Sequence, residues 1–233
     1  MRLDKFLTVT GTASRSEAAK AVRIGRVLVD GVPAGSPSCA VDPEKNKVEY
    51  FGELVEYRKF TYIMLNKPEG YVSATEDGRD KTVLELLPEK LRKFNLFPCG
   101  RLDKYTVGLM LLTDNGPLGH RLLAPKSHVS KTYYFEVEKP ISAEDVRALE
   151  NGVHIAGGYL TKPSKVMLLS DLSGNITITE GTYHQIKQML EAVDNKITVL
   201  ERITFGPLTL DGSLARGEWR FLTQEEIDML EKL

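Results

Sequence analysis

The feature that most constrains the fold of this chain is the alternation of short strand-like and short helix-like segments after residue 60. Apolar segments typical of strands lie at 62–65, 109–113, 132–137, 166–169, 176–179 and 197–205. Segments with helical periodicity lie at 117–123, 142–152 and 183–193, and a last one follows Thr223. This mixture predicts an α+β domain built on a mixed, mainly antiparallel sheet flanked by helices.

The N-terminal residues predict a separate, small α/β module. Apolar residues at helical spacing indicate a first helix at 3–10, and Ser14-Arg15-Ser16-Glu17 has the capping-box pattern that opens a second one. A short strand at 27–29 leads into Asp30-Gly31, a strong tight-turn signal. A charged, mixed segment at 53–60 indicates a linker or domain boundary near residues 57–61. We therefore expect two domains, at 1–59 and 60–233.

Charge is distributed unevenly along the chain. Its 233 residues include 31 Lys and Arg and 32 Asp and Glu, which gives a formal net charge of −1. Residues 1–29 contain six basic and two acidic residues, whereas residues 218–233 contain five acidic and two basic ones. The average charge gives no hint of a nucleic-acid partner, but the N-terminal basic excess keeps such a partner open.

Cysteine usage and hydropathy predict a cytoplasmic protein without a membrane partner. Two cysteines cannot build a disulfide framework, and with four histidines they leave little scope for a zinc cluster. The longest apolar runs, such as 109–112, are too short to cross a bilayer, and the first residues lack the apolar core of a signal peptide. Glycine-rich nucleotide-binding motifs are missing, so cofactor chemistry has little support.

A polar loop at 100–108 stands directly before the apolar strand. Asp103 follows Leu102, and packing of Leu102 and of the strand beneath the loop can fix the position of its carboxylate. The neighbouring cations Arg101 and Lys104 favour the ionised form that a nucleophile or base needs. Asp103 is equally consistent with a turn aspartate that accepts hydrogen bonds from backbone N–H groups.

Two further segments carry side chains suited to chemistry. Tyr133 and Tyr134 face opposite sides of their predicted strand, so one of them could stack on a flipped base, although half-buried strand tyrosines are common. In the helix predicted at 183–193, Lys187 could pair with a carboxylate from elsewhere in the chain. A solvated Lys187 and a hydrogen-bonded His184 are the alternatives.

These segments occur together with several shorter motifs, in an order that identifies a family. One run reads Gly100-Arg101-Leu102-Asp103-x-x-Thr106-x-Gly108-Leu109-x-Leu111-Leu112-Thr113-x-x-Gly116. Further matches lie at 65–71, 131–133, 160–163 and 183–189. Together they resemble the RNA pseudouridine synthases, in the branch named after ribosomal small subunit pseudouridine synthase A. Residues 1 to about 50 resemble a small RNA-binding module that is shared with a small-subunit ribosomal protein.

The resemblance implies an enzyme that isomerises a specific uridine to pseudouridine in ribosomal RNA and needs no metal or cofactor. It implies that Asp103 is the nucleophile or base, and that Tyr133 stacks on the extruded uracil and takes part in proton transfer at C5. Lys187 would pair with Asp103 and keep it ionised. The family often has a second basic residue directly after Lys187, where this chain has Gln188.

The resemblance also implies residues that bind the substrate. Arg101 would hold the opened RNA through its phosphates, and Leu190 would help to wall the pocket. The N-terminal module would attach the RNA electrostatically through its basic residues, namely Arg2, Arg15, Lys20, Arg23 and Arg26.

The segments at 66–73 and 82–88 look more like the small-subunit branch than the large-subunit one. We therefore expect small-subunit (16S) ribosomal RNA, free or in a pre-ribosomal particle, as the partner of a monomeric protein. The alternatives are a large-subunit rRNA pseudouridine synthase and a non-catalytic RNA-binding ribosome-assembly factor. A glycoside hydrolase that uses Asp103 with Asp114 or Glu180 is a weaker alternative, because no paired acid lies in a clear motif.

Overall fold

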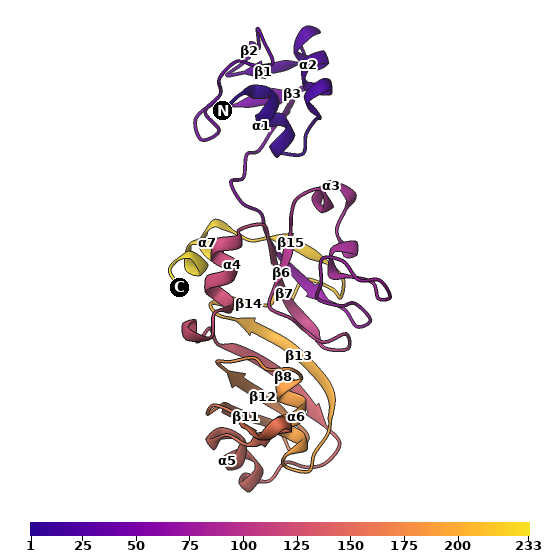
Figure 1. Cartoon of the computed structure of the whole chain (residues 1–233), viewed down its shortest axis with the longest axis vertical. Coiled ribbons are helices and arrows are strands. Elements are labelled where there is room, and N and C mark those ends of the chain that lie inside the picture. The colour runs from indigo at the N-terminus through magenta and orange to yellow at the C-terminus, as the bar shows by residue number, and fades with distance from the viewer. The chain divides into compact units, whose positions relative to one another are not determined.

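The computed structural model describes residues 1–233, which form two compact units (Figure 1). One unit comprises Met1–Phe60 and Pro88–Phe94, and the other comprises Thr61–Leu87 and Asn95–Leu233. None of the helices combines the length and the apolar character that a membrane span requires.

The smaller unit packs two helices against a four-stranded antiparallel sheet of order β2-β1-β3-β4. Its core is formed by apolar side chains of both helices and of two strands, among them Leu3, Phe6, Ala18 and Val27. Its elements are α1 (Leu3–Val9), α2 (Arg15–Arg23), β1 (Val27–Val29), β2 (Val32–Pro33), β3 (Val48–Tyr50), β4 (Glu53–Leu54) and α3 (Glu89–Arg92).

Local sequence signals in this unit act as predicted. The side chain of Ser14 accepts a hydrogen bond from the N–H of Glu17, and the carboxylate of Glu17 accepts one from the N–H of Ser14. Helix α2 begins directly after Ser14, at Arg15. Asp30 and Gly31 both have positive φ, 53° and 79°, and Val29 pairs with Val32 across them. Two consecutive residues with positive φ make the type I′ turn, whose twist matches a two-residue hairpin.

The larger unit is built on one nine-stranded sheet, whose main path is β11-β12-β8-β13-β7-β5-β15. Strand β6 pairs with β7 and β14 with β13, and every pair is antiparallel except β13 with β7. The prediction of a mixed, mainly antiparallel sheet flanked by helices is therefore confirmed. The strands are β5 (Tyr62–Lys67), β6 (Phe97–Cys99), β7 (Val107–Thr113), β8 (Lys131–Val137), β11 (Lys165–Ser170), β12 (Ser173–Ile178), β13 (Ile197–Phe205), β14 (Leu208–Thr209) and β15 (Trp219–Phe221).

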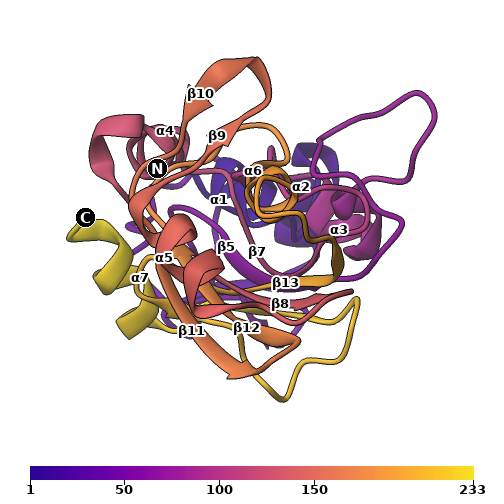
Figure 2. The same cartoon turned by 90° about the horizontal axis from the view of Figure 1, so that it is seen from below.

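Helices and a hairpin accompany this sheet. A separate two-stranded hairpin, β9 with β10, precedes β11 in the chain, and Figure 2 shows α6 to one side of strands β8 and β13. The remaining elements are α4 (Gly116–Leu123), α5 (Ala143–Asn151), α6 (Gln185–Glu191), α7 (Gln224–Glu231), β9 (His154–Ile155), β10 (Tyr159–Leu160) and the 3-10 helices η1 (Val83–Leu86), η2 (Pro125–Ser127) and η3 (Ala156–Gly158).

The register of the large sheet places four residues side by side in one row. Arg202 on β13 pairs with Tyr133 on β8 and with Gly108 on β7, and Gly108 pairs with Lys67 on β5. Directly paired residues project from the same face of a sheet. A Cβ on Gly108 would lie 2.4 Å from the carbonyl oxygen of Arg202, so this close approach of the two strands requires glycine.

Two local predictions are wrong. The helix predicted at 183–193 begins only at Gln185, because His184 has a left-handed backbone with φ of 51°. Tyr183 therefore precedes the helix. The strand predicted at 62–65 is too short, because β5 continues to Lys67, which is fully buried. Sequence alone ended the strand at Leu65 because Pro68 and Gly70, which are typical of turns, follow closely.

Candidate active site

Asp103 lies in the loop between β6 and β7, and the backbone of this loop is anchored on both sides of the residue. Leu102 is buried, and the hydroxyl of Ser73 donates to its carbonyl at 2.8 Å and accepts from its N–H at 2.9 Å. The N–H of Thr106 donates to the carbonyl of Asp103 at 3.1 Å, and all residues of β7 are buried directly after it. The loop can therefore hold a carboxylate in a defined position.

The same loop is held from beneath by the buried ammonium group of Lys67. Its Nζ donates to the carbonyls of Asp103 at 3.0 Å, Lys104 at 3.2 Å and Thr106 at 2.8 Å, and also to that of Pro68 at 3.2 Å. An ammonium group has three N–H donors, so at least one of them serves two carbonyls. Burial lowers the pKa of Lys67 to about 8, and the nearby Asp103 carboxylate opposes that shift.

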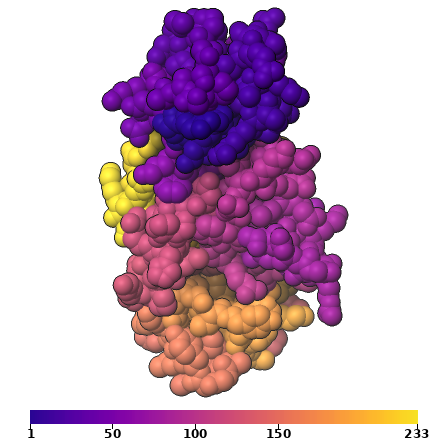
Figure 3. Space-filling view, turned by 45° about the horizontal axis from the view of Figure 1, so that its top comes forward, coloured from indigo at the N-terminus to yellow at the C-terminus, as the bar shows by residue number.

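The carboxylate of Asp103 contacts two basic side chains from the start of α6. Lys187 Nζ lies 3.0 Å from Oδ2, and His184 Nε2 lies 3.4 Å from Oδ1. The side chain of Asp103 remains 28% exposed, so a substrate can reach it. In the space-filling view of Figure 3, the orange segment that contains α6 borders the magenta segment that contains this loop. The structure thus joins two of the residues that the sequence singled out.

Tyr133 lies on β8 in the same sheet row as Arg202, and it is 7% exposed. Its neighbour Tyr134 takes the other face and donates its hydroxyl to Glu136 at 2.6 Å, as the predicted alternation requires. Tyr133 has no hydrogen bond to Asp103. The side chain of Tyr133 therefore lies on the same face of the sheet as those of Arg202 and Lys67, but it is not hydrogen-bonded to the Asp103 carboxylate.

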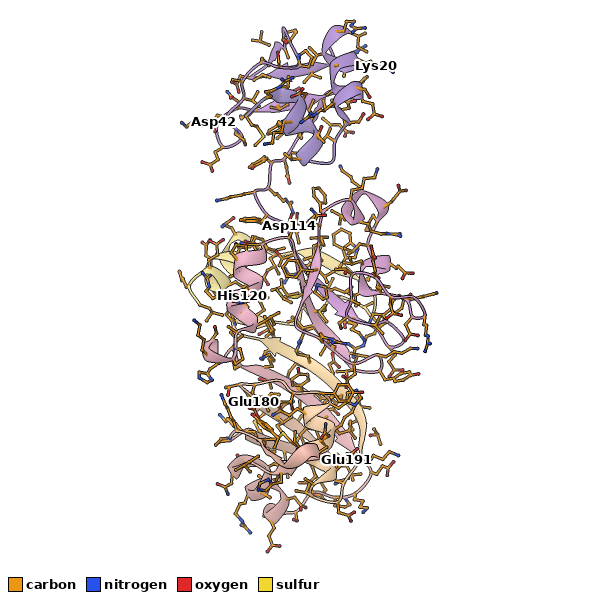
Figure 4. All side chains as sticks on the ribbon, in the orientation of Figure 1. Lys20, Asp42, Asp114, His120, Glu180 and Glu191 are labelled. Carbon is orange, nitrogen blue, oxygen red and sulfur yellow. The ribbon has the colours of Figure 1, made fainter.

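The predicted substrate-binding residues lie in different surroundings. Arg101 is exposed next to Asp103, whereas Leu190 is fully buried in α6. Arg2 is bound by both carboxylate oxygens of Asp4, at 3.1 and 2.7 Å. Lys20 projects outward from α2 (Figure 4). Unlike Arg2, the remaining four residues of this group are exposed and form no ion pair: Arg15, Lys20, Arg23 and Arg26.

Residues 61–192, which include Asp103, Tyr133 and Lys187, match the RNA pseudouridylate synthase family, and residues 1–45 match the S4 domain. The chain belongs to the RNA pseudouridylate synthase family. It is therefore a pseudouridine synthase with an S4 domain at its N-terminal end.

Relatives and a solved structure match this pseudouridine synthase over almost its whole length. It is 50% identical to an uncharacterised RNA pseudouridine synthase of Bacillus subtilis (strain 168), over 99% of this chain and 98% of the relative. It is 40% identical to ribosomal small subunit pseudouridine synthase A of Escherichia coli (strain K12), over 97% of this chain and 98% of the relative. A crystal structure of a pseudouridylate synthase, 38% identical, superposes with a TM-score of 0.71 and covers 99% of both chains.

Sequence reasoning missed several residues that organise the site of this pseudouridine synthase. Lys67, Ser73 and His184 contact the Asp103 loop or its carboxylate, and none was singled out for that purpose. Arg202 is 1% exposed, and its Nε donates to the carbonyl of Leu109 at 2.7 Å. A charged residue inside an apolar strand was the signal that could have identified Lys67 and Arg202, because buried charges require specific partners.

The carboxylates considered for a glycosidase are engaged elsewhere in this pseudouridine synthase. Asp114 accepts from the N–H of Thr61 at 2.6 Å. Glu180 accepts from the N–H of Lys162, the hydroxyl of Tyr159 and the amide of Gln185. Asp114 and Glu180 (both labelled in Figure 4) form no pair with Asp103. No group of three or more His, Cys, Asp and Glu side chains could hold a metal ion.

Proposed function

We propose that this pseudouridine synthase converts a specific uridine of small-subunit ribosomal RNA to pseudouridine, with Asp103, Tyr133 and Lys187 as its catalytic residues. The observation that carries the proposal is the contact of 3.0 Å between Lys187 and Asp103, inside the segment that matches the family. The target RNA rests on the relatives of about 40% identity that are named ribosomal small subunit pseudouridine synthase A.

The reaction is an isomerisation, so every atom of the uridine is retained. The bond between N1 of uracil and C1′ of ribose breaks, a bond between C5 and C1′ forms, and the proton of C5 is replaced by one on N1. Asp103 acts as the nucleophile or base, and Lys187 balances its charge and fixes its orientation. Tyr133 stacks on the uracil and takes part in the proton transfer at C5. Arg101 holds the RNA through its phosphates. Leu190 helps to form the wall of the pocket.

Access to the glycosidic bond requires the uridine to leave its stack, which costs a few kcal/mol. Contacts with the rest of the RNA must offset that cost. We propose that residues 1–59 supply electrostatic attachment through Arg2, Arg15, Lys20, Arg23 and Arg26, while residues 60–233 carry the chemistry. We also propose that the protein acts as a monomer in the cytoplasm, on free ribosomal RNA or on a pre-ribosomal particle.

The experiment that tests the catalytic assignment compares two isosteric substitutions. Asp103→Asn removes the proposed nucleophile, while Asp194→Asn changes another surface aspartate paired with lysine, 2.7 Å from Lys139. Each variant is incubated with small-subunit ribosomal RNA, and release of tritium from C5-labelled uridine is measured. We expect no release with Asp103→Asn and normal release with Asp194→Asn. Normal release by folded Asp103→Asn would exclude Asp103 as the catalytic group.

Mapping of pseudouridines tests the substrate assignment. Ribosomal RNA from cells with and without the protein is compared, and the modification should disappear from one small-subunit uridine. Its disappearance from large-subunit RNA would identify the other branch. If no uridine changes but ribosome assembly is impaired, the assembly-factor alternative replaces the enzymatic one.

A further inference from the structure

An exposed aromatic ring stands next to the proposed catalytic carboxylate. Tyr183 is 77% exposed, and its ring is stacked on that of His184 with a centroid distance of 3.8 Å and an interplanar angle of 20°. The imidazole of His184 lies 3.4 Å from the carboxylate of Asp103. One face of the Tyr183 ring therefore covers the imidazole that contacts Asp103, and its high exposure leaves the other face accessible.

The backbone holds this ring pair in place at a cost in strain. His184 has φ of 51°, a conformation that few residues other than glycine adopt. Side chains of α6 fasten the segment: the amide of Gln188 donates to the carbonyl of Tyr183 at 2.5 Å, and the amide oxygen of Gln185 accepts from the N–H of Thr182 at 3.0 Å. Strain that the surroundings maintain in this way is characteristic of functional sites.

The Tyr183 side chain is not packed into the core, as its 77% exposure shows. Its hydroxyl forms no hydrogen bond, and its only ring contact is with His184. Large aromatic side chains exposed beside a site commonly provide stacking surfaces for nucleobases, because every base has a π-face. A base next to an extruded uridine loses a stacking partner and exposes such a face.

We propose that Tyr183 stacks on the nucleobase adjacent to the target uridine and so takes the place of the base that leaves the helix. This inference rests on the proposed function, since it requires that a uridine is extruded to Asp103. It makes Tyr183 a residue that positions the RNA and leaves the bond-making steps to Asp103. Recognition by stacking alone also tolerates different neighbouring bases.

The test is a double-mutant cycle between the protein and its RNA. Wild type, Tyr183→Leu and Tyr183→Phe are assayed on an RNA fragment with the target uridine, and on two fragments in which the base on the 5′ or the 3′ side is replaced by an abasic residue. We expect Tyr183→Leu to raise KM about 10-fold with little change in kcat, as expected for loss of a stacked base. Tyr183→Phe keeps the aromatic ring, so its KM should rise less than that of Tyr183→Leu.

The abasic fragments decide the role. One abasic fragment should raise the KM of the wild type about as much as Tyr183→Leu does on the intact fragment. The same abasic fragment should not raise the KM of Tyr183→Leu any further. If Tyr183→Leu matches wild type, if the abasic penalty persists in Tyr183→Leu, or if kcat falls while KM stays constant, the stacking inference is wrong. In those cases the wild type still forms pseudouridine and the proposed function stands. A wild type that forms none overturns the proposed function and, with it, this inference.

Discussion

The buried ammonium group of Lys67 contacts Asp103 at its backbone carbonyl and not at its carboxylate. The ammonium of Lys67 donates to the carbonyl of Asp103 at 3.0 Å, while the carboxylate of Asp103 turns to Lys187 at the surface. The buried cation thus holds the main chain of the loop, and the partly exposed Lys187 contacts the carboxylate that we propose to react. This separation leaves the carboxylate accessible while its backbone is held in place, an arrangement that suits the proposed catalytic role.

Replacing Lys67 by methionine should destabilise the protein and reduce its activity. Methionine fills the space of the stem but removes the ammonium donor from four carbonyls, of which only those of Asp103 and Lys104 keep a backbone N–H donor. We expect a loss of about 2–4 kcal/mol in the free energy of unfolding. Urea titration measures the loss. Lys131→Met is the control and should cost less, because half-buried Lys131 donates to a single carbonyl, that of Val129, besides lying over the Phe205 ring. Equal losses in the two variants would contradict a special role for Lys67.

Replacing Lys187 should lower turnover without unfolding the protein. Lys187 is partly exposed and contacts Asp103 at 3.0 Å. In Lys187→Met the carboxylate loses a charged hydrogen-bond partner, and we expect kcat to fall about 10- to 100-fold, the equivalent of one such bond. Lys187→Arg keeps the charge and should retain more activity. Steady-state kinetics on ribosomal RNA measure kcat of both variants, and unchanged kcat in Lys187→Met would refute the assignment.

Neutralising the four unpaired basic residues of the N-terminal group should reduce the salt dependence of RNA binding. Arg15, Lys20, Arg23 and Arg26 are exposed and free of ion pairs, so they can contact phosphates. If each contacts one phosphate, their joint replacement by glutamine should reduce the slope of log K against log salt by about 3. Replacing Lys139 and Lys196, which pair with Asp194 and Glu138, is the control and should leave the slope intact. Identical slopes for both variants would argue against electrostatic attachment by this group.

Stability of the C-terminal part of the sheet should decline in acid. Hydrogen bonds from Ser213 and the Arg220 guanidinium lower the pKa of Asp211 to about 2, from an ordinary value of 3.8. A lowered pKa stabilises the folded state above pH 3.8, and this contribution disappears as the pH falls through 2. Asp211→Asn should therefore be less stable than wild type at pH 6, with a difference that narrows towards pH 2.

Urea midpoints across this pH range measure the effect of Asp211→Asn. The control is Asp171→Asn, because the Asp171 side chain is exposed and forms no hydrogen bond or ion pair. Its stability should follow that of wild type at every pH. A gap between Asp211→Asn and wild type that stays constant from pH 6 to pH 2 would contradict the assigned linkage.

Local signals in the sequence predicted most elements of the fold. The capping pattern at Ser14 and Glu17 and the Asp30-Gly31 turn act over a few residues, so they keep their meaning wherever the chain packs. The start of α6 was missed although the contact beside it is also local. The side-chain amide of Gln188 donates to the carbonyl of Tyr183 five residues earlier, and the spacing of apolar residues does not reveal such a contact.

The sequence by itself determined the family and the fold class of this protein, because the family's motifs and the signals for strands and helices each consist of residues that are close together in the chain. Only the tertiary structure decided how the site is built. Lys67, Asp103 and Lys187 come from three distant segments, and Arg202 reaches the row of Tyr133 and Lys67 through strand pairing. A buried charge is stable only among specific partners. Those partners become neighbours only when the sheet brings remote parts of the chain together.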